Sequence, residues 1–239
     1  MSLNWFKGRK SLPAEKDVAR EYIKIQHAEE ASKRLFKDGK KLSDATVVAG
    51  RAATKVGSDF NTLTGENECG NILKKTMSDC GRMTQDKNQL IQKTLVDPMK
   101  KYNSIFPHLN SQIKSHEKCQ QEYKRLQAKV DKLNEKEETG SNLVKKQNLK
   151  KDLTPVKDEF EAKHSMLLDE FPAFYNSRLQ YLQPLFESLV LTQSWHHNEL
   201  NKLFNTALND LTNGEPERDL EEDVRETLEQ IRALSITQD

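Results

Sequence analysis

The sequence predicts an all-α protein, built as a long, kinked, antiparallel three-helix coiled coil. Apolar residues recur three or four positions apart over long stretches, which is the period of a helix that buries one face. Charged residues make up 31% of the chain and apolar residues only 35%, a composition typical of slender helices with exposed faces rather than of a compact α/β enzyme. Helices of about 50 to 70 residues would be roughly 75 to 105 Å long.

The first predicted helix begins at Pro13 and stops at Thr64 and Gly65, because proline suits a first helical turn and glycine suits a helix end. Alanines dominate its middle, and such small side chains let another helix approach closely, within the bundle or in a second copy of the chain. A slender three-helix bundle leaves apolar surface uncovered, so we expect a twofold-symmetric homodimer. The predicted dimer interface contains Ala45, Ala49, Ala52 and Val56.

The second predicted helix begins between Asn67 and Asn71 and continues to Glu138. Pro98 and Pro107 lie inside it. Because proline removes a backbone hydrogen bond and clashes with the preceding turn, each is predicted to bend this helix without ending it. Beyond the first of these prolines, a stripe at helical spacing is predicted to be buried: Tyr102, Ile105, Leu109, Ile113, His116, Tyr123, Leu126, Val130 and Leu133.

Charges of opposite sign flank the end of this stripe. One flank carries a basic row, Arg125, Lys129, Lys132 and Lys136, and the other carries an acidic edge, Asp131, Glu135 and Glu138. A helix exposed evenly to water has no need of this segregation, so the basic row is a candidate binding surface. A hairpin turn follows at residues 139–142, where Ser141 or Asn142 is predicted to cap the next helix.

The third predicted helix extends to Asn213 and contains prolines at positions 155, 172 and 184. Pro216 then opens a short acidic helix that is predicted to run from Glu217 to Leu234. Residues 209–239 hold ten acids and three arginines, a net charge of −7, whereas residues 1–208 carry +8. The predicted organisation is an N-terminal amphipathic or disordered segment (1–12), a helical domain (13–213) and an acidic C-terminal helix or tail (214–239).

The N-terminal segment combines aromatic and basic residues. Leu3, Trp5 and Phe6 stand beside two lysines and an arginine, a mixture typical of segments that lie at a membrane surface. We predict that these three side chains insert between lipid headgroups. The alternative is an inert tail, since Gly8 and the shortness of the segment disfavour a helix.

No pattern in the sequence indicates an enzyme: it has neither a phosphate-binding glycine loop nor a Cys-x-x-Cys pair. His196, His197 and Glu199 suggest a metal site, but adjacent helical residues point about 100° apart. We therefore expect no catalytic residue, metal or cofactor. Three cysteines without a signal-like apolar segment indicate a reducing, intracellular setting, and no run approaches the roughly 18 apolar residues of a membrane span.

Several strings of residues resemble the BAR domains of the amphiphysin and bridging integrator family. They are YKRLQAKV at 123–130, DEFEAK at 158–163 and EFPAFYNSRL at 170–179, and the resemblance covers nearly the whole chain. It implies a crescent-shaped homodimer that binds or bends anionic membranes, with links to actin organisation, cytokinesis and endocytosis. Because the sequence stops at Asp239, the C-terminal Src-homology module of larger relatives is expected to be absent.

Charge pattern and resemblance together predict a non-enzymatic protein that senses or shapes membrane curvature. We expect it in the cytoplasm, peripheral at membranes and the cytoskeleton. The predicted lipid-binding residues are Arg125, Lys129, Lys132, Lys136, Lys145, Lys146, Lys150 and Lys151; the alternative for them is a solvated helical face. The competing function is a coiled-coil scaffold that binds a small GTPase or an actin-associated protein. Nucleic acid is not expected as a partner, because no recognised reading motif accompanies the basic residues.

Overall fold

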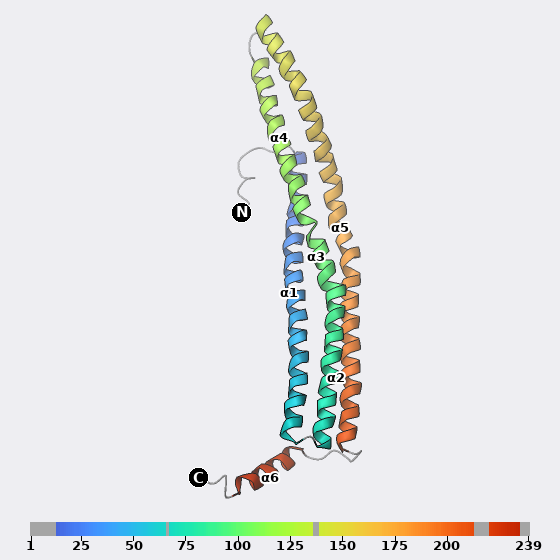
Figure 1. Ribbon diagram of the computed structural model, residues 1–239. Helices are drawn as coiled ribbons and strands as arrows, with labels where there is room; N and C mark the ends of the chain where they lie inside the picture. Colours follow the sequence, from blue (N-terminus) through green and yellow to red (C-terminus); the bar gives the residue numbers. More distant parts are fainter. Residues whose placement is uncertain (1–12, 66, 136–138, 213–219, 235–239) are drawn as a thin grey trace. The chain divides into compact units, whose positions relative to one another are not determined.

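Every element in the part of the chain that the structure describes is helical. The computed structural model describes residues 13–65, 67–135, 139–212 and 220–234. Its elements are α1 (Pro13–Leu63), α2 (Glu68–Ile91), a π-helical segment η2 (Gln92–Val96), α3 (Asp97–Asn103), α4 (Phe106–Asn134), α5 (Gly140–Thr212) and α6 (Leu220–Arg232) (Figure 1). The predicted all-α class is confirmed.

Two compact units divide the chain. The first is Met1–Val47 with Asp86–Ser194, and the second is Val48–Gln85 with Trp195–Asp239. In the first unit, α4 and the early part of α5 run side by side in opposite directions, and the early part of α1 joins them (Figure 1). In the second unit, the end of α1, the start of α2 and the end of α5 lie side by side (Figure 1). Each unit is therefore a helical bundle in its own right.

The ends of α1 agree with the sequence signals. This helix begins at Pro13 and ends at Leu63, and Gly65 follows with φ of 66°. That left-handed backbone conformation is open to glycine at little cost, which is why the helix stops here. Three prolines lie inside α5, yet this helix continues unbroken for 73 residues.

The cap of α5 differs from the prediction. The backbone N–H of Leu143 donates to the Thr139 carbonyl oxygen at 3.0 Å, and the N–H of Asn142 reaches the Thr139 hydroxyl at 3.4 Å. Thr139 is thus the N-cap residue of α5: its carbonyl oxygen accepts the first hydrogen bond of the helix, and its hydroxyl caps a free backbone N–H. The predicted caps at Ser141 and Asn142 are wrong, because the helix starts before them, at Gly140.

Pro98 and Pro107 divide the second predicted helix. Ahead of Pro98 lies η2, where the N–H of Asp97 bonds the carbonyl oxygen of Gln92, five residues earlier. Ahead of Pro107, residues 104–105 form a turn between α3 and α4. Proline has no N–H to continue the hydrogen-bond ladder, so the chain changes its winding just before each one. The prediction that each proline bends the helix without ending it is wrong at Pro107, because α3 stops before this residue and α4 begins.

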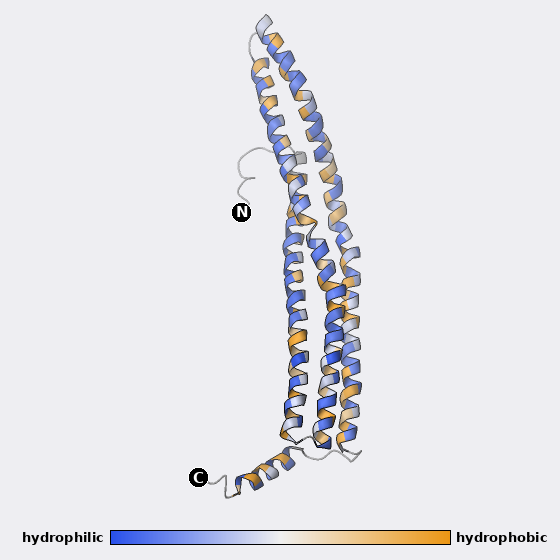
Figure 2. Ribbon diagram, in the orientation of Figure 1, coloured by the Kyte–Doolittle hydropathy of each residue, from blue (hydrophilic) through white to orange (hydrophobic). Residues whose placement is uncertain are grey.

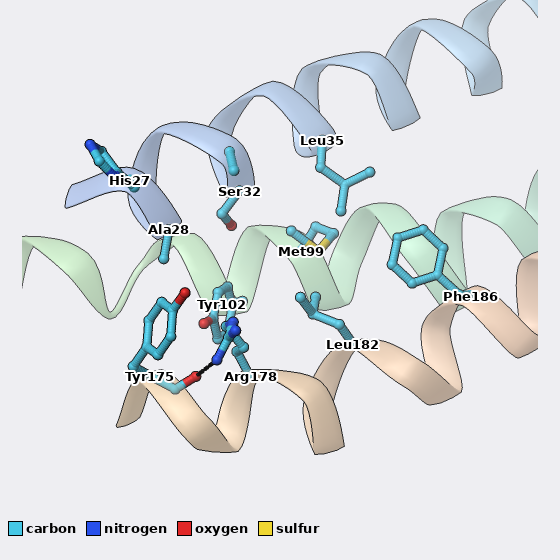
Figure 3. Close-up of a pocket in the computed structure, with 11 residues that line it drawn as sticks. His27, Ala28, Ser32, Leu35, Met99, Tyr102, Tyr175, Arg178, Leu182 and Phe186 are labelled. Carbon is cyan, nitrogen blue, oxygen red and sulfur yellow. Dashed lines mark hydrogen bonds between the residues drawn. The ribbon is translucent and has the colours of Figure 1, made fainter. Parts of the chain in front are cut away.

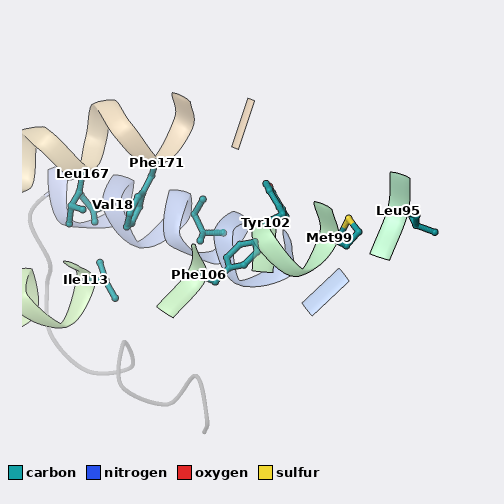
Figure 4. Close-up of a cluster of buried hydrophobic side chains, with 9 residues drawn as sticks. Val18, Leu95, Met99, Tyr102, Phe106, Ile113, Leu167 and Phe171 are labelled. Carbon is teal, nitrogen blue, oxygen red and sulfur yellow. The ribbon is translucent and has the colours of Figure 1, made fainter. Parts of the chain in front are cut away.

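The core of the first unit joins α1, η2, α3, α4 and α5 (Figure 4). Phe106 at its centre is 0% exposed, whereas Ile105 is 39% exposed. The predicted stripe is therefore wrong at Ile105, because the turn ahead of Pro107 shifts the helical register by one residue. The buried members of this core are Val18, Ile25, Leu95, Met99, Tyr102, Phe106, Ile113, Leu167 and Phe171.

The second unit packs α1 against α2 through glycines. A Cβ atom added at Gly57 would lie 2.7 Å from the Cβ of Met77, and one added at Gly81 would lie 3.1 Å from the carbonyl oxygen of Gly50. Helices that approach this closely have little room for apolar side chains between them. Hydropathy accordingly varies from residue to residue along these helices (Figure 2), and large apolar residues lie exposed instead: Val48, Val56, Leu63, Phe204 and Leu208.

Candidate functional site

The far end of α4 and the start of α5 form a hairpin, which we call the α4–α5 hairpin. Its two helices are joined by a cluster in which Leu126, Val130 and Leu153 are buried, with Tyr123, Leu149 and Val156 packed against them. The ring of Tyr123 also stacks on Phe160, with 5.4 Å between the ring centroids. These contacts determine which faces of the two helices meet, and therefore on which side of the hairpin each charged residue lies.

The basic row lies on one side of this hairpin. Arg125, Lys129 and Lys132 are all exposed on α4, and each stands one position before a residue of the packed stripe. One residue turns a helix by about 100°, so the three side chains share one flank of the contact with α5. Lys136, the fourth member, lies outside the described residues.

Lys118 extends the basic row toward the start of α4. It is exposed and stands one position before Cys119, which is 8% exposed and continues the buried stripe. The sequence prediction missed this lysine because its stripe stepped over Cys119. Treating cysteine as a small apolar residue would have continued the stripe and revealed Lys118.

Glu122 offsets part of the row's positive charge. The Arg125 guanidinium donates from Nε to Glu122 Oε2 at 2.9 Å and from Nη2 to Oε1 at 2.5 Å. This hydrogen-bonded pairing lowers the pKa of the Glu122 carboxyl, although water and salt screen such an exposed pair. Lys129 and Lys132 form no ion pair with any residue that the structure describes. These two lysines therefore carry the net positive charge of the described row.

The four lysines at the start of α5 do not share one side. α5 runs antiparallel to α4 (Figure 1), with its packed stripe facing that helix. Counting about 100° per residue from this stripe, Lys145 lies on the same side as the basic row. Lys146 and Lys150 lie on the opposite side, and Lys151 lies on the face turned away from α4. The eight predicted lipid-binding residues are thus only partly brought together.

The residues predicted for the dimer interface lie on an exposed face of α1. Ala45, Ala49, Ala52 and Val56 are all exposed, and Leu42 begins the same face. Their spacing of 3, 4, 3 and 4 residues places them on one stripe of the helix. The buried side of α1 over residues 43–61 is instead small or polar: Ser43, Thr46, Gly50, Gly57 and Asn61. This later part of the helix turns small and polar groups inward and an apolar stripe outward.

The residues predicted to insert into a membrane, Leu3, Trp5 and Phe6, lie outside the described residues. Across the parts of the chain that are described, no helix combines the length and the hydrophobicity that crossing a bilayer requires.

The histidine pair on α5 is divided between core and surface. His196 is 5% exposed, and its Nε2 lies 3.3 Å from Thr84 Oγ1. Because the Thr84 hydroxyl donates to the Cys80 carbonyl oxygen at 2.8 Å, the histidine N–H is the donor in the contact with Thr84, which assigns the proton to Nε2. His197 is exposed. Within the described ranges, no three His, Cys, Asp or Glu side chains are grouped to hold a metal ion.

Comparison with known proteins agrees with this architecture. The family model for the BAR domain matches residues 16–213. Bridging integrator 3 of Rattus norvegicus is 42% identical over 236 residues, covering 96% of this chain and 93% of the relative. The Xenopus laevis homolog of bridging integrator 3 is 38% identical over 256 residues, covering 100% of both. The solved amphiphysin BAR domain from Drosophila has a TM-score of 0.73 at 17% identity, covering 86% of this chain and 95% of that chain.

The fold is thus that of an antiparallel helical bundle with a long α4–α5 hairpin, as in solved BAR domains. The chain belongs to the BAR domain family. The resemblance seen in its sequence is confirmed, and its similarity to bridging integrator 3 extends over nearly the whole length.

Proposed function

We propose that this protein acts as a homodimer that binds anionic membranes and senses or shapes their curvature, without catalysing a reaction. The observation that carries the proposal is the match to the BAR family over residues 16–213. BAR domains are structural proteins that form homodimers and bind membranes. We further propose that residues 13–213 act as the BAR domain, with the segments 1–12 and 214–239 appended, and that the protein works in endocytosis, cytokinesis and actin organisation.

The basic row is the proposed lipid contact. Lys129 and Lys132 supply exposed charge that no described carboxylate neutralises, and Lys145 of α5 adds to the same side. Basic side chains near an anionic leaflet contribute additively to binding, and a dimer presents each one twice. Arg125 contributes as well once an anionic headgroup competes with Glu122 for its guanidinium.

Charge reversal tests this contact. Changing Arg125, Lys129, Lys132 and Lys136 to glutamate should nearly abolish co-sedimentation with vesicles rich in phosphatidylserine. The fold should survive, because the described members of the row are exposed beside the packed stripe. Wild-type binding should also fall steeply as salt rises from low to physiological concentration, because the screening length shortens.

The acidic edge offers a matched control. Changing Asp131, Glu135 and Glu138 to lysine reverses three charges on the other flank, against four in the basic row, and should leave binding intact or strengthen it. Binding that survives reversal of the basic row but not of the acidic edge would mean that the opposite face meets the membrane. Wild-type protein that ignores anionic vesicles altogether would instead favour the scaffold function.

The outward apolar stripe of α1 is the proposed dimer interface. Leu42 and Val56, the two ends of this stripe, are 37% and 56% exposed in the single chain, and a second copy would remove such surface from water. Light scattering at micromolar concentration should give twice the 27.6 kDa mass of the chain. Ala49→Glu should weaken association before it unfolds the helix, since Ala49 is exposed. A wild-type particle of monomer mass would contradict the proposal.

The N-terminal segment is proposed to insert into the bilayer through Leu3, Trp5 and Phe6. In a Trp195→Phe background, Trp5 fluorescence should shift to the blue when anionic vesicles are added, because indole emission responds to leaving water. Removing residues 1–12 should reduce vesicle tubulation more than binding. An unchanged spectrum at full binding would show that the segment is an inert tail.

A further inference from the structure

The C-terminal helix α6 presents an apolar stripe to solvent. Val224, Leu228, Ile231 and Leu234 recur four, three and three positions apart, and every residue from 221 to 234 is exposed. Hydrophobic and hydrophilic residues alternate along this helix (Figure 2). A helix of 13 residues is marginal in water on its own, because most helical stability in proteins comes from packing an amphipathic face. These four residues, the α6 stripe, therefore predict a docking surface.

The end of α5 presents an apolar stripe of matching spacing. Phe204, Leu208 and Leu211, which we call the α5 end stripe, recur four and three positions apart. They are 40%, 55% and 41% exposed. Both stripes belong to the second unit, so each offers the other an apolar face of similar length.

The linker between the two helices is short. It consists of seven residues, 213–219, and connections of about 2 to 8 residues are typical of neighbouring helices in bundles. A short flexible linker holds the segments that it joins at a roughly millimolar effective concentration. The apolar hollow of the first unit, about 310 Å³ between α1, α3 and α5, takes its α5 wall from residues 175–186 (Figure 3). The α5 end stripe instead directly precedes the linker, so it is the surface of α5 that the linker brings to α6.

Charge favours the α5 end stripe over an anionic membrane as the docking surface for α6. This helix contains five acidic residues and two arginines, a net charge of −3, and the negative surface of a membrane repels such a helix. Asn205 and Asn209 are exposed one position after Phe204 and Leu208, and Asn201 continues the row. One flank of the α5 end stripe is therefore uncharged. Packed there, α6 buries its apolar side and leaves its carboxylates in water.

A second copy of the chain needs the same surface. An interface of standard size draws about 20 to 30 residues from each partner, whereas the proposed dimer stripe of α1 holds five, from Leu42 to Val56. Further apolar area must come from neighbouring helices, and in the second unit the end of α5 lies beside the end of α1 (Figure 1). The α5 end stripe supplies larger side chains than the alanines of α1. Two partners therefore compete for it.

We propose that α6 folds back onto the α5 end stripe of its own chain, and that a second copy must displace it to form the dimer. This inference rests on the proposed homodimer and adds a control on its assembly. In dilute protein, the effective concentration of the tethered helix exceeds the concentration of partner chains, so α6 occupies the stripe. The second copy prevails where chains become concentrated, as on a membrane surface.

Engineered cysteines test the contact within one chain. The full-length protein carries Cys69→Ser as background, because Cys69 is exposed, and is kept below the dimerisation range. Leu208→Cys combined with Leu228→Cys should form an intramolecular disulfide under mild oxidation. Leu208→Cys combined with Glu226→Cys should not, because Glu226 lies about 200° around α6 from Leu228. Equal cross-linking of the two pairs, or of neither, would overturn the docking of α6.

A Leu228→Asp variant tests the competition with a second copy. A charge in the α6 stripe should release the α5 end stripe and leave the bundle intact, since Leu228 is 44% exposed. If docking is favoured about tenfold in each chain, freeing both chains lowers the dimer dissociation constant about a hundredfold. Sedimentation equilibrium of the full-length protein measures this constant. Gln230→Asp adds the same charge about 200° around the helix from Leu228 and should leave the constant unchanged.

The dimer dissociation constant also separates this inference from the proposed function. An unchanged constant in Leu228→Asp would overturn the competition and leave the proposed dimer intact. A weaker dimer would overturn it as well, because α6 would then belong to the dimer contact. If wild type and Leu228→Asp both stayed monomeric at every concentration, the dimer itself would be contradicted, and the competition with it.

Discussion

Replacing Gly57 with alanine tests whether α1 and α2 are held in contact by the absence of a side chain. In an exposed helix interior this change stabilises a protein by about 1 kcal/mol, because alanine is the better helix former. Here the added Cβ would lie 2.7 Å from the Cβ of Met77, and 3.2 Å from both the carbonyl oxygen of Leu73 and the Cα of Lys74. None of these atoms can rotate away, so the helices themselves must separate.

Gly57→Ala is therefore expected to destabilise the protein rather than to stabilise it. Overpacking a tight contact costs about 1 to 3 kcal/mol, and a clash with three rigid atoms belongs at the upper end. Subtracting the gain of about 1 kcal/mol in helix propensity leaves Gly57→Ala destabilised by about 2 kcal/mol. The measurement is urea unfolding followed by circular dichroism, at one fixed protein concentration because self-association contributes to stability.

Two other glycines serve as controls. Gly140 has no neighbour within 4 Å and no positive φ, so Gly140→Ala should be neutral or stabilising by up to about 1 kcal/mol. Gly65 also has no neighbour within 4 Å but has φ of +66°, so Gly65→Ala should cost about 1 to 2 kcal/mol through backbone strain alone. A Gly57→Ala variant as stable as wild type would refute the close contact between α1 and α2.

Two further changes probe the first unit. Phe106→Ala should destabilise the protein by about 3 to 5 kcal/mol in the same unfolding experiment, whereas Ile105→Ala should cost well under half as much, because only Phe106 is fully buried; similar losses would contradict the register of α4. For Glu29, burial opposes ionisation most, but hydrogen bonds from Lys33 and Asn110 outweigh it and lower the carboxyl pKa below 4.5. The wild type should therefore lose stability as pH falls below about 4.5 through that lowered pKa, and Glu29→Gln should lose less; parallel pH curves would contradict this.

Local signals along the chain were sufficient to predict the helical class and the ends of α1. Pro13 marks the start of α1 because proline restricts its own backbone to a helical φ. Gly65 marks the end because glycine permits the left-handed conformation, and neither effect depends on the surroundings. The recurrence of apolar residues every three or four positions likewise predicted the buried Leu126 and Val130 of α4, because a helix has a fixed angular repeat. A match to the BAR family was also predictable, since it is carried by strings of residues that lie close together in sequence.

Only the tertiary structure shows on which side of the α4–α5 hairpin each lysine lies. Spacing places Lys145 and Lys150 on helical faces of α5 but does not say which face meets α4. Only the packing of Leu126 and Val130 against Leu153 decides that, and it divides the lysines between two sides.

The charge of the basic row and the register of its helix also depended on three-dimensional contacts. Glu122 lies only three residues from Arg125, but their pairing depends on side-chain conformations that composition does not specify. The shift from Ile105 to Phe106 arises from the turn ahead of Pro107, which changes the helical phase by an amount that a periodic pattern cannot show.

The sequence by itself determined the helical class, the ends of α1 and the family, because these depend on backbone preferences and on residues that are neighbours in the chain. The tertiary structure decided what faces inward. Glycines and small polar residues of α1 are buried because a second helix lies against them, and Val56 is left exposed because that helix approaches from the other side. Hydrophobicity predicts the opposite arrangement, since burial is a property of what surrounds a residue and not of the residue alone.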